Sequence, residues 1–158
     1  MSKIKKFSEI QKISEKLKKE GKIIVFTNGC FDIIHPGHIK LLKEAKSFGD
    51  VLIVGLNKDI SVKKIKGEKR PVIDEKGRAE ILSSFEMVDY VVLFGDKTPK
   101  RLIKKILPHF IVKGGDYKED EVVGKDIVEK YGGKVIIVGL YRNYSTTNII
   151  KKINGRDI

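Results

Sequence analysis

Hydrophobic positions along the chain form two kinds of pattern, and the two kinds alternate. Short apolar runs rich in β-branched residues predict five strands, at Lys22–Phe26, Val51–Leu56, Tyr90–Phe94, Phe110–Lys113 and Val135–Leu140. Apolar residues three or four positions apart predict helices at Ser8–Glu20, Gly37–Phe48, Asp74–Phe85, Thr98–Leu107, Glu119–Tyr131 and Thr146–Ile153. Parallel strands need covering connections, which helices supply with a right-handed crossover. The pattern therefore predicts an α/β domain with a five-stranded parallel sheet and helices on both faces.

Local signals mark the ends of several of these elements. Ser8 and Gln11 have the spacing of a capping box, and Gly21 supplies a stop for the first helix. Asp74 suits the cap of a later helix. The basic segment Lys63–Arg70, which ends before a proline, is interpreted as a mobile loop.

The chain shows neither an internal repeat nor a linker. We therefore expect residues 1–158 to form one domain, with a packing helix in residues 1–21 and an α/β core in residues 22–153. A chain of this length removes about two-thirds of its unfolded surface from water, which is enough for its own core.

Polar, glycine-containing segments follow four of the predicted strands, the first, second, fourth and fifth. The carboxyl ends of parallel strands meet at one edge of the sheet, and ligands bind there, where the strand order reverses. A Rossmann-like domain with one ligand site at this edge is therefore expected.

The segment Thr27–His38 comes between the first strand and the following helix. Free backbone N–H groups of such a loop and the positive end of the helix can hold a phosphate group. If the helix begins near Pro36, His35 and His38 face one side of its first turn. Pro36 also keeps His35 extended rather than helical.

A second polar segment, Tyr144–Thr147, precedes the last helix. Its hydroxyl groups and free N–H groups make another phosphate cradle, to which Arg142 and Lys66 can add positive charge. Two cradles at one edge indicate a triphosphate. The alternative is that Ser145 and Thr146 only cap the helix.

Composition limits the classes of function. The net charge of +12, from 33 Lys and Arg against 21 Asp and Glu, attracts polyanions such as nucleic acid or nucleotide and sugar phosphates. The lysines are spread along the chain, which favours solvated helix faces. A single cysteine excludes an intrachain disulfide and a cysteine-based zinc site. Apolar runs far below the ~18 residues of a membrane span, and a polar start, favour a soluble cytoplasmic protein.

Two other kinds of site use the same residues. Asp32, His35 and His38 are ligand types that suit zinc, and Cys30 beside them is a conceivable nucleophile. Both rank below phosphate contact, because the extended His35 disturbs ligand geometry and nothing else indicates acyl transfer. His109, next to a proline, is interpreted as a surface or core residue.

The chain resembles the cytidylyltransferase-like nucleotidyltransferases, which carry a histidine pair in an H-x-G-H motif. The matching positions are Gly29, Phe31, Asp32, His35, Gly37 and His38, together with the distal Ser145, Thr146 and Thr147. Within this superfamily, the sequence around these motifs is similar to the heptose-1-phosphate adenylyltransferase domain of ADP-heptose synthase. Further matches are Thr27-Asn28, Asn57-Lys58-Asp59, Lys66-Gly67, Arg70-Pro71-Val72, Val112 to Tyr117 and Asn148-Ile149-Ile150.

The resemblance implies transfer of AMP from ATP to D-glycero-D-manno-heptose 1-phosphate, with release of pyrophosphate. It assigns catalysis to His35, His38 and Lys66. It assigns nucleotide binding to Thr27, Asn28, Gly29, Cys30, Phe31, Gly37, Lys113, Gly114, Asp116, Ser145, Thr146 and Thr147. It places Asp32, Asn57 and Arg142 toward the acceptor. Mg²⁺ would be bound mainly through the ATP phosphates, without a dedicated protein site.

The same likeness implies partners. The sugar-kinase domain that precedes this one in bifunctional relatives is missing from the sequence, so a separate kinase and a phosphatase are expected in the pathway. A homodimer is allowed, whereas a membrane or nucleic-acid partner is not expected.

Two departures from the family pattern keep alternatives open. Glu68 stands where the cytidylyltransferases carry a second lysine, which Lys69 could replace, and the approach to Ser145 reads Arg142-Asn143-Tyr144. One alternative is a cytidylyltransferase acting on glycerol 3-phosphate or another alcohol phosphate. The other, of a different class, is a non-catalytic nucleic-acid-binding protein.

Overall fold

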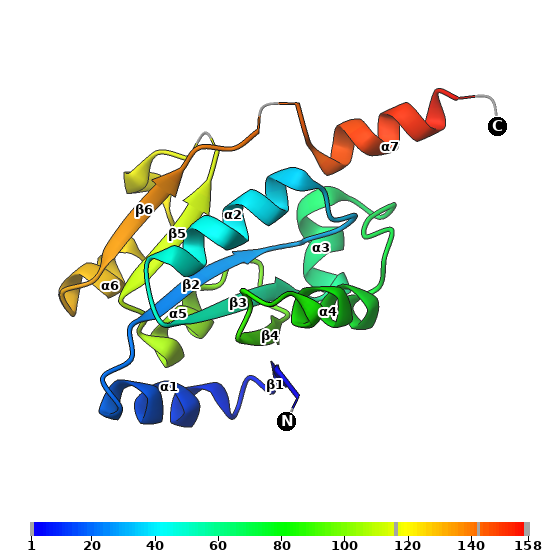
Figure 1. The fold of residues 1–158 in the computed structure, drawn as a ribbon. Coiled ribbons are helices and arrows are strands. Elements are labelled where there is room, and N and C mark those ends of the chain that lie inside the picture. The colour runs from blue at the N-terminus through cyan, green and yellow to red at the C-terminus, as the bar shows by residue number, and fades with distance from the viewer. Residues whose placement is uncertain (1, 116, 142, 157–158) are drawn as a thin grey trace.

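The computed structural model describes residues 2–115, 117–141 and 143–156. Six strands in this part of the chain form one parallel sheet in the order β1-β4-β3-β2-β5-β6 (Figure 1). The strands are β1 (Ile4–Lys5), β2 (Ile24–Gly29), β3 (Val51–Asn57), β4 (Tyr90–Phe94), β5 (Phe110–Gly114) and β6 (Lys134–Val138). Strand order reverses between β2 and β5, so the predicted ligand edge exists at that point.

Helices cover both faces of the sheet, as predicted. They are α1 (Ile10–Lys19), α2 (Pro36–Ser47), α3 (Asp59–Lys66), α4 (Glu75–Ser84), α5 (Lys100–Ile106), the 3₁₀ turn η1 (Glu119–Glu121), α6 (Lys125–Lys130) and α7 (Thr146–Asn154). One core layer joins α1, α5 and α6 to the sheet, and the other joins α2 and α4. In Figure 1 α7 extends away from this body.

The sheet has one strand more than expected. β1 pairs in parallel with β4, Ile4 opposite Val91, at the edge of the sheet. Only two residues take part and lysines flank Ile4, so the chain carries no apolar run there. The five-stranded prediction was therefore wrong by one short edge strand.

The first core strand begins and ends later than predicted. β2 runs from Ile24 through Gly29, and it pairs with β3 along its whole length. Thr27, Asn28 and Gly29 are thus strand residues, and the loop begins at Cys30. Their polar character reflects the ligand edge and not a turn.

Two other predictions on local structure were wrong. Residues 63–66 of the supposed loop belong to α3, which buries Ser61 and Val62 and ends at Gly67 with φ 99°. The Ser8–Gln11 capping box does not form, since α1 begins at Ile10 with Glu9 as N-cap, and the Glu9 carboxylate accepts from the Lys6 N–H at 2.8 Å.

The helix predicted at Glu119–Tyr131 is divided. Gly124 adopts φ 93° between η1 and α6, and a Cβ there would lie 2.7 Å from the Ile103 side chain. The predicted cap at Asp74 is confirmed, because its carboxylate accepts from the Gly77 N–H at 2.8 Å. None of the helices in the described residues has the length and apolarity that a membrane crossing requires.

Candidate active site

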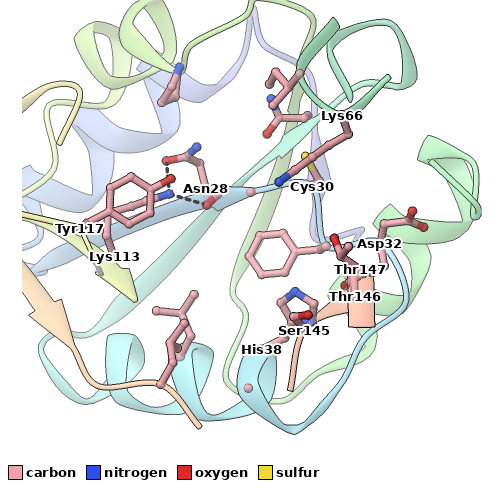
Figure 2. A pocket seen from close by; sticks show the side chains of 18 of the residues that line it. Asn28, Cys30, Asp32, His38, Lys66, Lys113, Tyr117, Ser145, Thr146 and Thr147 are labelled. Carbon is pink, nitrogen blue, oxygen red and sulfur yellow. Dashed lines mark hydrogen bonds between the residues drawn. The ribbon is translucent and has the colours of Figure 1, made fainter. Parts of the chain in front are cut away.

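A cavity of about 600 Å³ opens at the carboxyl edge of the sheet (Figure 2). This volume lies in the range of small-molecule sites. Most of the residues predicted from sequence line it: Asn28, Gly29, Cys30, Phe31, Asp32, His35, Gly37, His38, Asn57, Lys66, Lys113, Ser145, Thr146 and Thr147. Residues far apart in the sequence thus meet in one site.

Four residues predicted for the site are not among the described residues that line the cavity. Thr27 is fully buried in β2, and its hydroxyl has no hydrogen-bond partner in the described part of the chain. Gly114 lies behind Leu140, whose side chain fills the space a Cβ would need. Asp116 and Arg142 lie outside the described residues.

The two histidines form a capping box at the start of α2. His35 is the N-cap in extended conformation, as Pro36 requires, and its Nδ1 accepts from the Gly37 N–H at 3.1 Å. Nδ1 of His38 accepts from the His35 N–H at 3.2 Å. The rings stack with centroids 3.8 Å apart. A Cβ at Gly37 would lie 2.8 Å from the His35 ring, so only glycine fits.

These bonds determine where each neutral imidazole carries its proton. Both Nδ1 atoms are acceptors, so the hydrogen of each neutral ring is on Nε2. Burial lowers the pKa of His35, and burial with the adjacent charge of His35 lowers the pKa of His38 to about 4. At neutral pH the pair therefore presents two N–H donors of fixed tautomer.

The carboxylate of Asp32 holds a neighbouring loop. It accepts from Arg70 Nε at 2.8 Å and from the N–H groups of Val72 and Ile73 at 2.8 and 3.0 Å. Burial acts to raise the pKa of Asp32, but these bonds outweigh it and the pKa is lowered. Its side chain is completely buried, so its clearest task is to fix the loop of Arg70 against the site.

Arg78 is a residue that the sequence reasoning missed. Its side chain is fully buried, and Nη1 donates to the carbonyl oxygens of Cys30 at 2.7 Å and Asn57 at 2.8 Å. Nη2 pairs with Asp59 at 2.6 Å, and Nε donates to the Ile73 carbonyl at 2.9 Å. One guanidinium thus joins the ends of β2 and β3 to α3 and α4. The sequence feature that could have identified it is an arginine close to Ala79 and Leu82, on a helix whose apolar residues face the core.

Two lysines supply cations to the cavity. Figure 2 shows Lys66, at the end of α3, reaching into it beside Cys30. Lys113 donates to the backbone and side-chain oxygens of Asn28 at 3.0 and 3.3 Å, and its ammonium lies 5.1 Å from the centroid of the Tyr117 ring. Burial lowers the pKa of Lys113 to about 8, so most of it is charged at neutral pH.

The thiol and metal alternatives gain no support from this geometry. Burial raises the pKa of Cys30 against the opposing charges of Lys66, Arg78 and Arg70, so the thiol stays protonated. Across the described ranges, no three His, Cys, Asp or Glu side chains are grouped to hold a metal ion.

The segment Tyr144–Thr147 both caps a helix and lines the cavity. Ser145 Oγ accepts from the Asn148 N–H at 3.0 Å as the N-cap of α7. Thr146 Oγ1 donates to the Asp32 carbonyl at 2.6 Å and so attaches α7 to the loop after β2. The helix cap is therefore confirmed, and the binding of a phosphate group by this segment stays a prediction.

Other lining residues were not predicted as site residues. They are Leu41, Ile65, Arg70, Lys97, Thr98, Pro99, Tyr117, Glu121, Val122, Val123, Leu140 and Tyr144. Lys97, Thr98 and Pro99 follow β4 at the same sheet edge as the predicted residues. The rule that selected the ends of the other strands would have found them.

Comparison with known proteins agrees with this site. The family model described as Cytidylyltransferase-like matches residues 26–154, which include both the H-x-G-H and the Ser-Thr-Thr segments. The chain belongs to the cytidylyltransferase-like family. The resemblance inferred from the motifs is thereby confirmed.

Curated relatives in the family are much longer than this chain. It is 56% identical over 152 residues to the Bifunctional protein HldE of Geobacter metallireducens, covering 96% of this chain and 31% of the relative. It is 57% identical over 156 residues to the Bifunctional protein HldE of Aliarcobacter butzleri, covering 99% and 32%. The chain thus spans about a third of the length of these relatives.

Solved structures share the fold. The crystal structure of the lipopolysaccharide core biosynthesis protein from Thermoplasma volcanium has a TM-score of 0.63 and 35% identity, covering 79% of this chain and 100% of that one. Pantoate-beta-alanine ligase from Francisella tularensis has a TM-score of 0.62 at 19% identity, covering 99% and 80%. The second likeness concerns the fold alone.

Proposed function

We propose that this domain is an adenylyltransferase that transfers AMP from ATP to D-glycero-D-manno-heptose 1-phosphate, forming ADP-heptose and pyrophosphate. The observation that carries the proposal is the histidine pair, fixed as two Nε2–H donors in one cavity with the start of α7. High identity to the HldE proteins supports it, as does the lipopolysaccharide role named for the Thermoplasma structure.

In the proposed reaction, a phosphate oxygen of the sugar phosphate attacks the α-phosphorus of ATP. A bond forms between that oxygen and phosphorus, the bond from phosphorus to the bridging oxygen breaks, and pyrophosphate leaves with the electron pair. The attacking phosphate is already anionic at neutral pH, so no strong general base is needed. Catalysis then rests on alignment and on stabilising the charge that develops on the phosphoryl oxygens.

The cavity offers suitable donors for that charge. His35 and His38 supply neutral N–H groups, Lys66 supplies a cation, and the start of α7 supplies the hydroxyl of Ser145 and free backbone N–H groups. Neutral donors suit this reaction because they hydrogen-bond the phosphates without giving up a proton.

Mg²⁺ enters this scheme as part of the substrate MgATP. In this proposal the ion is held mainly through the triphosphate, without a dedicated protein site. The proposal keeps the roles that the family pattern implies for four other residues. The acceptor is assigned to Asp32, Asn57 and Arg142, and nucleotide binding to Asp116.

A cytidylyltransferase is the second candidate, favoured by the description of the matching family. Pyrophosphate release measured with each of four nucleoside triphosphates, against heptose 1-phosphate and glycerol 3-phosphate, separates the two. We expect turnover with ATP and heptose 1-phosphate. Turnover only with CTP and an alcohol phosphate would replace the first proposal by the second.

A non-catalytic nucleic-acid binder is tested in the same preparation. That alternative expects oligonucleotide binding with steep salt dependence and no turnover. Lys66→Ala should lower turnover, whereas Lys64→Ala, an exposed lysine on the same helix, should leave it unchanged. Equal losses in the two variants would show a general effect of charge.

A further inference from the structure

Tyr144 stacks with the His35 imidazole. The two rings are nearly parallel, with an interplanar angle of 16° and centroids 6.2 Å apart. The His38 ring also stacks with His35, with centroids 3.8 Å apart. His35 therefore has two aromatic neighbours, one from another segment and one that is the second histidine of the motif.

His35 has little else to hold its ring. It stands outside the helix as the N-cap, and the one side-chain hydrogen bond described for it is that from the Gly37 N–H to Nδ1. This bond and the stack on His38 both lie within the first turn of α2, so Tyr144 adds a contact from another segment. A flat neighbour on an independent segment restrains rotation of the His35 ring, because aromatic pairs prefer defined stacking geometries.

The segment that carries Tyr144 is itself attached to the site. Tyr144 directly precedes Ser145, the N-cap of α7, and Thr146 donates to the Asp32 carbonyl at 2.6 Å. The β6–α7 connection thus contacts the segment after β2 through the residues on both sides of Ser145, which are Tyr144 and Thr146. Contact at Tyr144 links the histidine pair to the second phosphate cradle.

We propose that Tyr144 is a positioning residue, whose ring keeps the Nε2–H of His35 oriented toward the phosphates bound at the start of α7. The assignment rests on the proposed function for its catalytic consequence, and on the stacked geometry for its structural one. The ring supplies the effect, and the hydroxyl is not needed for it.

Three variants separate this role from a merely structural one. Tyr144→Ala removes the ring, Tyr144→Phe keeps it, and Tyr141→Ala removes another half-exposed tyrosine of the same connection, whose ring packs edge-on against Tyr144 with centroids 6.3 Å apart. Tyr144 is 46% exposed, so its loss should leave the fold intact.

The kinetic test compares kcat and the KM for ATP. Tyr144→Ala should lower kcat by about three- to tenfold, the range that one aromatic pair supplies, with the KM for ATP within about twofold. Tyr144→Phe and Tyr141→Ala should retain wild-type kcat. Equal losses in Tyr144→Ala and Tyr141→Ala, or a loss in Tyr144→Phe as large as in Tyr144→Ala, would overturn the proposal.

A second test needs no substrate. NMR titration of the His35 ring should show a higher pKa in Tyr144→Ala than in the wild type, because burial lowers this pKa and the variant removes one neighbour that buries the ring. The groups that face or border His35 are His38, Tyr144 and, at the outer side, Lys40, Lys43 and Glu44, while Asp32 acts through His38. Apart from Tyr144 itself, these groups and the nearby Tyr141 stay in place in the variant.

The titration separates failure of this proposal from failure of the proposed function. An unchanged His35 pKa in Tyr144→Ala overturns the positioning role even if AMP transfer is observed. A raised pKa in that variant, with the wild-type value in Tyr144→Phe, supports the role whichever nucleotide and acceptor the domain uses.

Discussion

In the proposed mechanism His38 has two tasks, one for each ring nitrogen. Its Nδ1 accepts from the His35 backbone N–H, while its Nε2–H is the donor left for a ligand. Asparagine places an oxygen near the position of Nδ1 and provides no group at Nε2. Replacement by asparagine therefore separates the structural task from the catalytic one.

We predict that His38→Asn folds as the wild type does but loses about 10²–10³-fold in kcat, the usual cost of one donor to a developing oxyanion. His38→Ala should lose the capping bond as well and be less stable by about 1 kcal/mol. Steady-state kinetics and urea unfolding of both variants check this. A fully active His38→Asn would remove Nε2 from the mechanism.

Stability should depend on pH through the same side chain. The pKa of His38 is about 4 in the folded protein, against an ordinary value of 6.5, so the unfolded chain binds more protons between these values. The free energy of unfolding must therefore fall as pH falls from about 6.5 to 4. Above about pH 6.5 the contribution of His38 to stability is fully present. Urea unfolding at several pH values should show this slope, reduced in His38→Asn. An unchanged slope would assign it to other groups.

At the level of elements, most of the fold followed from apolar spacing, and the errors have physical causes. β1 was not predicted because two residues among lysines form no apolar pattern. Its pairing with β4 exists only in the folded sheet. Thr27–Gly29 looked like a loop because functional strand ends carry polar residues. α3 looked like a loop because its exposed face is basic, although Ser61 and Val62 are buried.

The division between η1 and α6 depends on Gly124, and this can be tested. Gly124 and Gly132 both have positive φ, but only at Gly124 would a Cβ meet atoms of Ile103 and Ile111 within 3.1 Å. Gly132→Ala should cost about 1 kcal/mol of stability from strain alone, and Gly124→Ala about 1–3 kcal/mol more from overpacking. Thermal or urea unfolding measures both. Equal losses of stability in the two variants would show that the side chains of Ile103 and Ile111 move aside and relieve the crowding at Gly124.

At the level of the whole molecule, motifs identified the residues of the site but not what connects them. Spacing placed His35, His38 and Ser145 at one sheet edge, because parallel strands end together. The burial of Asp32 and its bond to Arg70 depend on contacts between segments 38 residues apart, which spacing does not report. Arg78 joins four segments through one guanidinium, and this connection exists only in three dimensions.

Arg78 should therefore matter more than any surface ion pair. Arg78→Leu leaves the carboxylate of Asp59 and the carbonyl groups at the cavity floor without their donor, and should cost about 3–5 kcal/mol of stability. Arg101→Leu breaks an exposed pair with Asp96 at 3.1 Å and should cost about 0–1 kcal/mol. Urea unfolding of the two variants compares them. Similar losses would mean that the buried connection adds nothing.

In the proposed reaction the domain transfers AMP to a sugar 1-phosphate. ³¹P NMR of the protein with MgATP and heptose 1-phosphate tests it most directly, with samples containing EDTA or the His35→Ala, His38→Ala double variant as controls. We predict equal amounts of a nucleoside diphosphate sugar and pyrophosphate, and neither product in the controls. Formation of ADP with inorganic phosphate, or unchanged ATP in the presence of Mg²⁺ and acceptor, would contradict the account.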